Sequence, residues 1–349
     1  MSEHRRALRA GVKATAARLW VLGFLLSLGV SPALSQESAP ATAEQTLRVS
    51  TEVVNVYAVV REKTNRLIPN LNREDFELSE DNVPQDIRYF SRETDTPLTL
   101  GIMIDTSPSQ GRVLDVEQAE AKTFLRQVLR PKDLAFVLHF DSDVELLQDF
   151  TSNLNLLTRA IEETVVRGGS SGPLRSPLPS PLPAPMPPPD PMAGVGGTHL
   201  YDAIYLAARE LMKNEVGRKV LILLSDGEDQ GSKVKLDAAL EAAHRSGVIV
   251  YSVAVIDRRF YWGHVMGFSG DSVLRKLSEQ TGGRVIEVKR ASDTGAAFQE
   301  IADELRTQYL LGYTPSHTRR GGSFRKIGLR VHDRDYKVQA RRGYYAPSE

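Results

Sequence analysis

Between residues 96 and 307, short apolar segments alternate with segments of helical periodicity, and this alternation restricts the fold more than any other feature of the sequence. The segment 98-LTLGIMI-104 is almost entirely apolar, which is typical of a strand buried on both faces of a parallel sheet. Further strands are predicted at 134–140, 144–150, 219–225, 248–255 and 284–288, and helices at 115–129, 153–165, 200–213, 234–246, 271–281 and 293–307. Repeated strand–helix alternation of this kind predicts a doubly wound, mostly parallel α/β domain.

One predicted helix has apolar residues near helical spacing. In 115-DVEQAEAKTFLRQVL-129, we expect Val116, Ala119, Phe124 and Val128 to form the face that packs on the sheet.

The segments that flank the α/β region are rich in predicted strands. Residues 47–95 contain 53-VVNVYAVV-60 and two alternating strands around a turn at Asp81-Asn82, and residues 308–346 contain three more strands, at 308–316, 324–332 and 335–345. Fewer than about 50 residues rarely form a stable core alone. We therefore predict one small β module built from both the N- and C-terminal segments.

In the first 35 residues, charged, apolar and small residues follow one another in the order that is typical of an export signal. Basic residues up to Arg18 precede the apolar run 19-LWVLGFLLSLGV-30, which is shorter than the roughly 20 residues that span a bilayer. We expect cleavage near Ser35-Gln36, a polar linker over 36–46, and a periplasmic or extracellular location; an uncleaved anchor is the alternative. The sequence has no cysteine, which excludes disulfides, thiolate metal sites and a lipid anchor at cysteine.

A proline-rich insertion, residues 173–192, interrupts the α/β pattern. Proline lacks an amide donor and fixes φ, so this segment is predicted to be extended or disordered rather than helical or part of a sheet. Because it ends shortly before Thr198, it is expected to emerge near the end of the sheet that carries the polar residues described next. It could fence that site, offer a contact arm, or have no role.

Oxygen-bearing side chains follow two of the predicted strands. Asp105, Ser107 and Ser109 come directly after 98-LTLGIMI-104, and Asp226 comes directly after 219-KVLILLS-225. Thr198 lies in a glycine-rich loop that enters a helix. Ligands of open parallel sheets bind beyond the carboxyl ends of the strands, near the switch in strand order. These five side chains are therefore candidates for a single site.

The residue types of this candidate site favour a hard cation. Carboxylate and hydroxyl oxygens suit Mg²⁺, Mn²⁺ or Ca²⁺ rather than zinc or copper. Hydroxyls are weak ligands, so an ion held by few carboxylates stays electron-poor and takes up an external carboxylate.

The same residues resemble a known motif. The segments 105-DTSPS-109, 196-GGT-198 and 225-SDGED-229 resemble the metal-ion-dependent adhesion site (MIDAS) of von Willebrand factor type A domains, over roughly residues 96–307. The resemblance implies a Rossmann-like sheet with helices on both faces.

The resemblance also implies a role for each ligand. Ser107 and Ser109 would bind the metal directly, Thr198 directly or through water, and Asp105 and Asp226 directly or through water. The segments 71–90, 309–316 and 341–347 resemble exported proteins related to von Willebrand factor type A domains that are common in acidobacteria.

The composition and the absence of several sequence motifs argue against nucleic-acid binding and against common classes of enzyme. Lys plus Arg and Asp plus Glu both number 44, so no basic excess points to nucleic acid. No Gly-x-Ser-x-Gly, His-Glu-x-x-His or phosphate-binding loop motif is present. We therefore expect a non-enzymatic, exported protein that uses its cation to capture an acidic group of a partner protein. The alternatives are a metal-dependent hydrolase at the same ion and a structural envelope scaffold without metal function.

Overall fold

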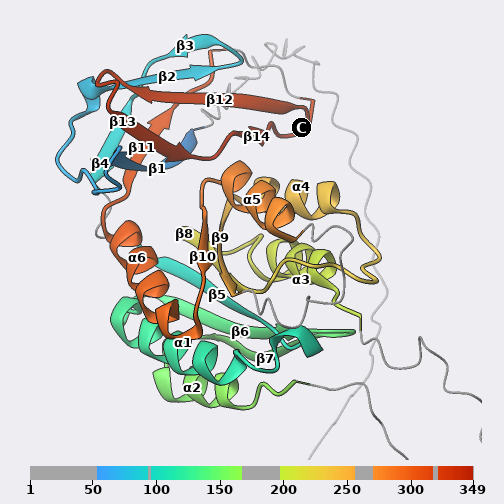
Figure 1. Ribbon diagram of the computed structural model, residues 1–349. Coiled ribbons are helices and arrows are strands. Elements are labelled where there is room, and N and C mark those ends of the chain that lie inside the picture. Colours follow the sequence, from blue (N-terminus) through green and yellow to red (C-terminus); the bar gives the residue numbers. More distant parts are fainter. Residues whose placement is uncertain (1–52, 93–95, 167–196, 256–269, 317–320, 349) are drawn as a thin grey trace, which may run out of the picture. The chain divides into compact units, whose positions relative to one another are not determined.

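The computed structural model (Figure 1) describes residues 53–92, 96–166, 197–255, 270–316 and 321–348. These residues all belong to one compact unit that begins at Ser50. The expected export signal, polar linker and proline-rich insertion lie outside the described residues. Within the described residues, no helix has the length and apolar character needed to cross a bilayer.

The central sheet is doubly wound and mostly parallel, as predicted. Its six strands are β5 (Leu98–Asp105), β6 (Leu134–Phe140), β7 (Val144–Thr151), β8 (Arg218–Leu224), β9 (Val248–Val255) and β10 (Val285–Val288). They are arranged in the order β10-β9-β8-β5-β6-β7, and only β7 is antiparallel to its neighbour. The chain first builds outward from β5 to β7 and then returns to place β8 on the other side of β5. The pair β5 and β8 is thus the topological switch point of the sheet.

Helices cover both faces of this sheet (Figure 1). They are α1 (Leu114–Val128), α2 (Leu154–Glu162), α3 (Leu200–Leu206), α4 (Leu236–Ser246), α5 (Gly270–Thr281) and α6 (Thr294–Arg306), with short helical turns η1 (Arg73–Asp75), η2 (Pro108–Gln110), η3 (Ala207–Leu211) and η4 (Ala291–Asp293). Apolar residues of α1, α2 and α6 pack into one core cluster, and those of α3, α4 and α5 pack into the other. Every residue of β5 is buried, as its apolar sequence predicts.

Two predicted helices differ from expectation in their extent. The helix expected over 200–213 is α-helical only to Leu206 and continues as a single π-helical turn over Ala207–Leu211. The helix expected over 153–165 ends at Glu162, and Asn153 caps its start by accepting a hydrogen bond from the Asn155 amide (3.0 Å). This cap satisfies one of the amides that every helix start leaves without an intrahelical partner.

The flanking segments form one β module from both ends of the chain, as predicted. One antiparallel sheet has the order β13-β1-β11-β4 and the other has the order β14-β12-β2-β3. The strands are β1 (Val54–Glu62), β2 (Phe76–Glu80), β3 (Val83–Gln85), β4 (Tyr89–Arg92), β11 (Tyr309–Tyr313), β12 (Phe324–Val331), β13 (Tyr336–Ala340) and β14 (Gly343–Tyr345). The predicted turn between β2 and β3 is confirmed, since Asp81 and Asn82 both have positive φ (48° and 68°) as in tight hairpin turns.

The single strand expected over 335–345 is wrong: the chain changes sheets after Ala340. β13 pairs with β1, whereas β14 pairs with β12. Gly343 allows the second pairing, because a Cβ there would lie 2.3 Å from the carbonyl oxygen of Arg325. A β-rich sequence with alternating polarity cannot show where a strand leaves one sheet for another.

A buried ion pair ties the two sheets of the β module together. The Glu80 carboxylate, 3% exposed, accepts hydrogen bonds from Arg325 Nη1 (2.6 Å) and from the hydroxyls of Tyr313 (2.7 Å) and Tyr344 (2.8 Å). Four strands therefore meet at one carboxylate. Removing one member of such a group leaves a buried charge without its partners.

A second buried carboxylate joins the β module to the α/β domain. Glu304 on α6 is fully buried and forms ion pairs with Arg61 of β1 and with Arg284, whose Nε lies 2.5 Å from Glu304 Oε1. Gln339 of β13 donates to the other carboxylate oxygen (3.1 Å). The module and the domain thus share a charged, hydrogen-bonded contact.

Replacing Gly101 by alanine is expected to destabilise the sheet. A Cβ at Gly101 would lie 2.4 Å from Phe136 Cζ and 2.5 Å from Leu221 Cδ2, and both side chains are fully buried. Overpacking of this kind costs about 1–3 kcal/mol, measurable by urea denaturation. Gly321→Ala is the matched control, because nothing lies within 4 Å of its added methyl group. Equal stability of the two variants would contradict this packing.

Acid is expected to weaken the fold through His244. Burial, and then the nearby charge of Arg341, lower the pKa of His244 from 6.5 to about 4. The unfolded chain therefore binds this proton between pH 6.5 and pH 4 while the folded chain does not. The free energy of unfolding should fall over that window by about 3 kcal/mol, at roughly 1.4 kcal/mol per pH unit.

The substitution His244→Phe isolates this contribution, because a phenyl ring keeps the aromatic contact with Phe324 (5.2 Å between ring centroids). The difference in unfolding free energy between wild type and variant should change with pH below 6.5 and stay constant above it. His332→Phe, at an exposed position, serves as the control. A pH-independent difference for His244→Phe would refute the assignment.

Candidate functional site

The candidate site lies at the carboxyl ends of β5 and β8, the two adjacent strands at the switch point. Asp105 is the last residue of β5, and Ser225 and Asp226 follow β8 directly. Asp105 is fully buried and Asp226 is 1% exposed. Parallel register places the ends of these two strands at the same edge of the sheet.

Asp105 fixes the geometry of both loops. Its Oδ2 accepts a hydrogen bond from Ser225 Oγ (2.6 Å), and its Oδ1 accepts one from the Ser107 amide (2.9 Å). Ser225 Oγ in turn accepts from the Gly227 amide (3.0 Å). One carboxylate therefore holds the start of the Asp-x-Ser-x-Ser loop against the loop that carries Asp226.

The two serines and Asp226 are connected through Gln110. Ser107 Oγ and Ser109 Oγ lie 3.0 Å apart, and Gln110 Nε2 lies 3.4 Å from Ser109 Oγ and 2.9 Å from Asp226 Oδ2. Gln110 is 1% exposed, and its Oε1 has no hydrogen-bond partner among the described residues. An amide group with a partial positive charge thus lies between two of the predicted metal ligands.

Thr198 is attached to the same group of loops through its backbone. Its amide donates to the Gln230 carbonyl oxygen (2.9 Å), and the Gln230 amide donates back to the Thr198 carbonyl oxygen (2.8 Å). The preceding Gly197 permits this approach, since a Cβ there would lie 2.4 Å from that same Gln230 oxygen. The structure thus links Asp105, Ser107, Ser109 and Asp226 by side-chain contacts and holds Thr198 next to the loop that follows Asp226.

Burial and like charge disfavour ionisation at this site. The pKa of Asp105 is raised from 3.8 to about 7, first by burial and then by the negative charge of Asp226, against which the hydrogen bonds from Ser107 and Ser225 act only in part. A cation next to these two carboxyl groups would favour their ionised forms. It would thereby oppose both the burial of Asp105 and the repulsion between Asp105 and Asp226.

Glu117 is a third buried carboxyl group that the sequence prediction missed. It lies on α1, is fully buried, and neither of its carboxyl oxygens has a hydrogen-bond partner within the described part of the chain. Its pKa is raised well above 4.5, first by burial and then by the charges of Asp105 and Asp226.

The predicted inner face of α1 was therefore partly wrong. Ala119 is exposed and Val116 is only half-buried, while Phe124 and Val128 are buried as expected. The buried positions are Leu114, Glu117, Ala121, Phe124, Leu125 and Val128. Glu117 fits the helical spacing of these buried positions. The prediction did not include it, because only apolar residues were used to assign the buried face.

The donor set fits a hard divalent cation. The site offers carboxylate, hydroxyl and amide oxygens and no sulfur or imidazole, as Mg²⁺, Mn²⁺ and Ca²⁺ prefer. Burial and the charge of Asp226 raise the pKa of Asp105, and the carboxyl oxygens of Glu117 and the Oε1 of Gln110 have no hydrogen-bond partner among the described residues. Among the described residues, no group of three or more His, Cys, Asp or Glu side chains has metal-binding geometry. The predicted ligands are two aspartates and three hydroxyls, so most of them are not acidic, histidine or cysteine side chains.

The fold is that of a doubly wound α/β domain with an oxygen-rich site at its switch point. Residues 191–303 match the family model of the von Willebrand factor type A domain, and the central sheet with its helices has the fold of that domain. The match includes Thr198 and Asp226, whereas Asp105, Ser107 and Ser109 precede it. Domains of this family often bind a divalent cation and typically mediate protein–protein interactions. No curated protein matches the chain.

Solved structures with a similar fold come from several organisms. Proximal thread matrix protein 1 from the mussel byssus is 13% identical over 65% of this chain, with a TM-score of 0.46, and this chain covers only 51% of that protein. A further structure of the mussel protein has a zinc-occupied MIDAS motif. BatB from Bacteroides thetaiotaomicron is 19% identical over 59% of this chain and 98% of its own length (TM-score 0.41). A von Willebrand factor type A protein from Catenulispora acidiphila is 12% identical over 78% and 73% of the two chains (TM-score 0.44).

Replacing Glu117 by leucine is expected to stabilise the metal-free protein. The substitution removes a buried carboxyl group that has no partner, and relief of such a group is worth about 1–3 kcal/mol. Urea denaturation in the presence of a chelator measures the change. Glu120→Leu, at a half-buried position on the same helix, should change stability by no more than about 0.5 kcal/mol. A loss of stability in Glu117→Leu would show that the carboxyl group makes a favourable contact.

Proposed function

We propose that this protein is an exported, metal-dependent protein-binding module. The observation that carries the proposal is the meeting of two buried carboxyl groups, Asp105 and Asp226, at the carboxyl ends of β5 and β8, with the buried Glu117 of α1 close enough for their charges to raise its pKa. A bound cation would offset this negative charge.

The ligand roles follow the resemblance to the adhesion motif and the contacts between the loops. Ser107 and Ser109 would bind the ion directly, with Thr198, Asp105 and Asp226 binding directly or through water. Glu117 would add negative charge behind these ligands without being one of them. The ion would be Mg²⁺, or alternatively Mn²⁺ or Ca²⁺. When bound, it supplies a Lewis-acidic position for an incoming oxygen.

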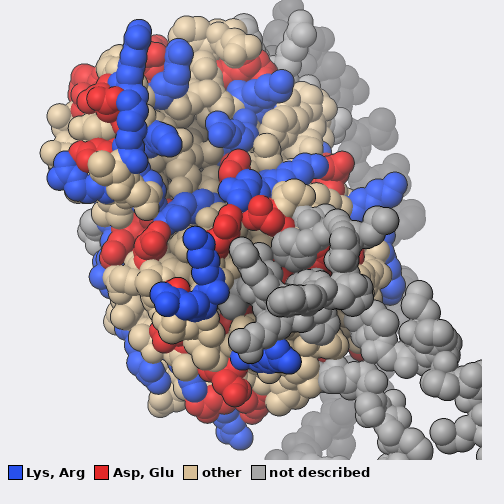
Figure 2. All heavy atoms as spheres, viewed as in Figure 1, with Lys and Arg blue, Asp and Glu red and all other residues tan. Residues whose placement is uncertain are grey.

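The partner would be a protein that presents an Asp or Glu side chain to the ion. Hydroxyl ligands leave the cation short of negative charge, so an external carboxylate can complete its coordination. The surface gives no sign of nucleic-acid binding on the face shown in Figure 2, where Lys and Arg side chains are interspersed with Asp and Glu. The apolar run in residues 1–35, with cleavage near Ser35-Gln36, is the basis for proposing export to the periplasm or the exterior.

Loss of a single ligand is expected to weaken cation binding strongly. Wild-type protein titrated with Mg²⁺ or Mn²⁺ in a calorimeter should bind about one ion, and Asp226→Asn should weaken binding by at least roughly tenfold. Asp237→Asn is the control for net charge, because its exposed side chain pairs with Lys276 on the surface. Unchanged affinity in Asp226→Asn would place the ion elsewhere.

Binding of a partner protein, as distinct from binding of the cation, is tested by a capture experiment on the exported protein fraction. Recovery of a partner should require the divalent cation and should fail with chelator or with Asp226→Asn. Capture that persists in chelator would contradict the proposed mechanism. Turnover of a substrate that depends on the metal and on Asp105 would instead indicate a hydrolase, and the absence of any metal binding by wild type would indicate a scaffold.

A further inference from the structure

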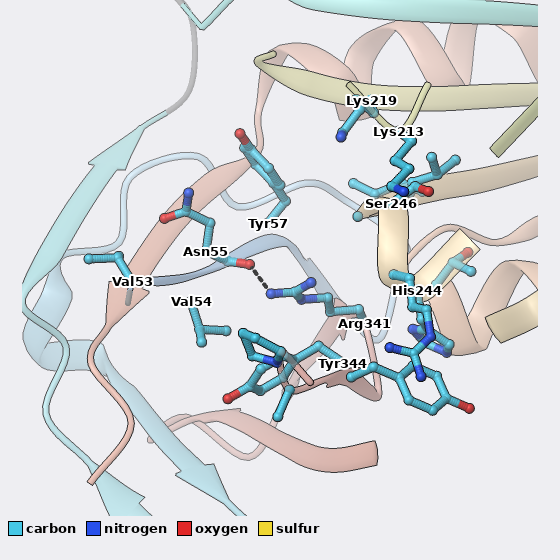
Figure 3. Close-up of a pocket in the computed structure, with 18 of the residues that line it drawn as sticks. Val53, Val54, Asn55, Tyr57, Lys213, Lys219, His244, Ser246, Arg341 and Tyr344 are labelled. Atoms are coloured by element: carbon cyan, nitrogen blue, oxygen red, sulfur yellow. Dashed lines mark hydrogen bonds between the residues drawn. The ribbon is translucent and has the colours of Figure 1, made fainter. Parts of the chain in front are cut away.

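A cavity lies at the edge of the central sheet opposite to the candidate metal site. It has a volume of about 630 Å³ and is bounded by the start of β8 and β9 and the end of α4 on one side and by β1 and β14 on the other (Figure 3). Lys219 is near the beginning of β8, whereas Asp226 follows the end of that strand. The cavity is therefore separate from the candidate metal site. Its size is within the range of small-molecule sites.

The lining of this cavity is strongly basic. Four cationic side chains contribute to it, and none of the described lining residues is an aspartate or glutamate. The cations are Lys213, Lys219, Arg245 and Arg341. Figure 3 shows Lys213 and Lys219 on the domain side, with Arg341 reaching toward β1 from the β module. Charges from segments distant in sequence thus converge on one hollow.

Arg341 is the residue that most clearly lacks a counter-charge. Its Nη2 donates to the Asn55 carbonyl oxygen (2.5 Å), and its guanidinium lies 5.5 Å from the centroid of the Tyr344 ring. Its Nε is buried and has no hydrogen-bond partner among the described residues. Burial also lowers the pKa of Arg341, although a guanidinium remains protonated at neutral pH. Among the described residues, no carboxylate pairs with this guanidinium, so its positive charge remains available to a ligand in the cavity.

The lysines add charge with little compensation from the lining. Lys219 is half-buried, and its Nζ donates to the Met212 carbonyl oxygen (3.2 Å); Glu215, which is not among the lining residues, acts on it electrostatically. Lys213 is exposed at the rim. The positive charge that faces the hollow therefore comes from Lys213, Lys219 and Arg341.

Arg245 and His244, which also line the cavity, contribute little further positive charge. Arg245 pairs with Glu241 (2.7 Å) and stacks over the Tyr345 ring (4.4 Å), so its charge is largely compensated. His244 is neutral at pH 7, because burial lowers its pKa to about 4. The carbonyl oxygens at the end of α4 accept from the Gly247 amide, which reduces their negative potential toward the cavity.

We propose that this cavity binds a small organic anion, whose carboxylate or phosphate group pairs with Arg341, Lys213 and Lys219. The body of the ligand lies against Val53, Val54 and the ring of Tyr57, which line the cavity beside Arg341. A planar guanidinium with a free donor suits an oxyanion of either kind. The proposal concerns a site distinct from the metal centre and does not depend on it.

The test uses two aromatic anions and a neutral analogue. Phenyl phosphate, phenylacetate and benzyl alcohol are titrated into the full chain in chelator at low ionic strength, with calorimetry as the readout. At least one anion should bind and the alcohol should not, and the stronger of the two anions identifies the group recognised. Arg341→Gln and Lys213→Ala should each weaken that binding, the former by roughly tenfold or more.

Two controls make the result decisive. Lys289→Ala removes an equal charge from an exposed position outside the cavity and should leave binding unchanged. If Arg341→Gln does not fold, as judged by circular dichroism, the exposed Lys213→Ala carries the test. The proposal is overturned if neither anion binds to wild type, if benzyl alcohol binds as well as the anions, or if Lys289→Ala weakens binding as much as Lys213→Ala does.

Discussion

Repulsion between carboxyl groups that the fold holds together is the interaction on which the site depends. Because β5 and β8 are adjacent and parallel, their ends coincide, and Asp105 and Asp226 cannot move apart without breaking the sheet. Ser225 and Ser107 donate to Asp105, yet these neutral donors do not offset burial and the charge of Asp226. The sheet therefore maintains an unfavourable electrostatic arrangement, which a divalent cation would convert into a favourable one.

The two edges of the sheet differ in electrostatic character. Carboxyl groups gather where the strands end, while Lys219 and Arg341 lie near where β8 begins. The β module produces the second of these environments, since Asn55, Tyr57 and Arg341 all come from it. The α/β domain alone would leave the start of β8 open to solvent. The flanking segments thus create a cavity as well as adding a second core.

The sequence was sufficient for the architecture, because apolar runs and helical periodicity report burial directly. The β5 run, the Asn153 cap and the Asp81-Asn82 turn all have local causes and were predicted. Glu117 was missed because a charged residue at an inward position violates the pattern used to find that face. Gln110 and the basic cavity could not be predicted for a different reason, because their contacts arise only from tertiary packing. Arg341, Lys219 and Asn55, for example, are far apart in the sequence and line the same cavity.

The assembly of the β module from both ends of the chain has a consequence for the order of folding. Val54 pairs with Tyr313, and Ala58 pairs with both Tyr309 and Ala340, so β1 has no partner until the last part of the chain has been synthesised. Every strand of the central sheet, by contrast, finds its neighbours within 98–288. The nascent chain can therefore complete the central α/β domain while the edges of β1 are still unpaired, and unpaired strand edges are prone to aggregation until their partners are synthesised.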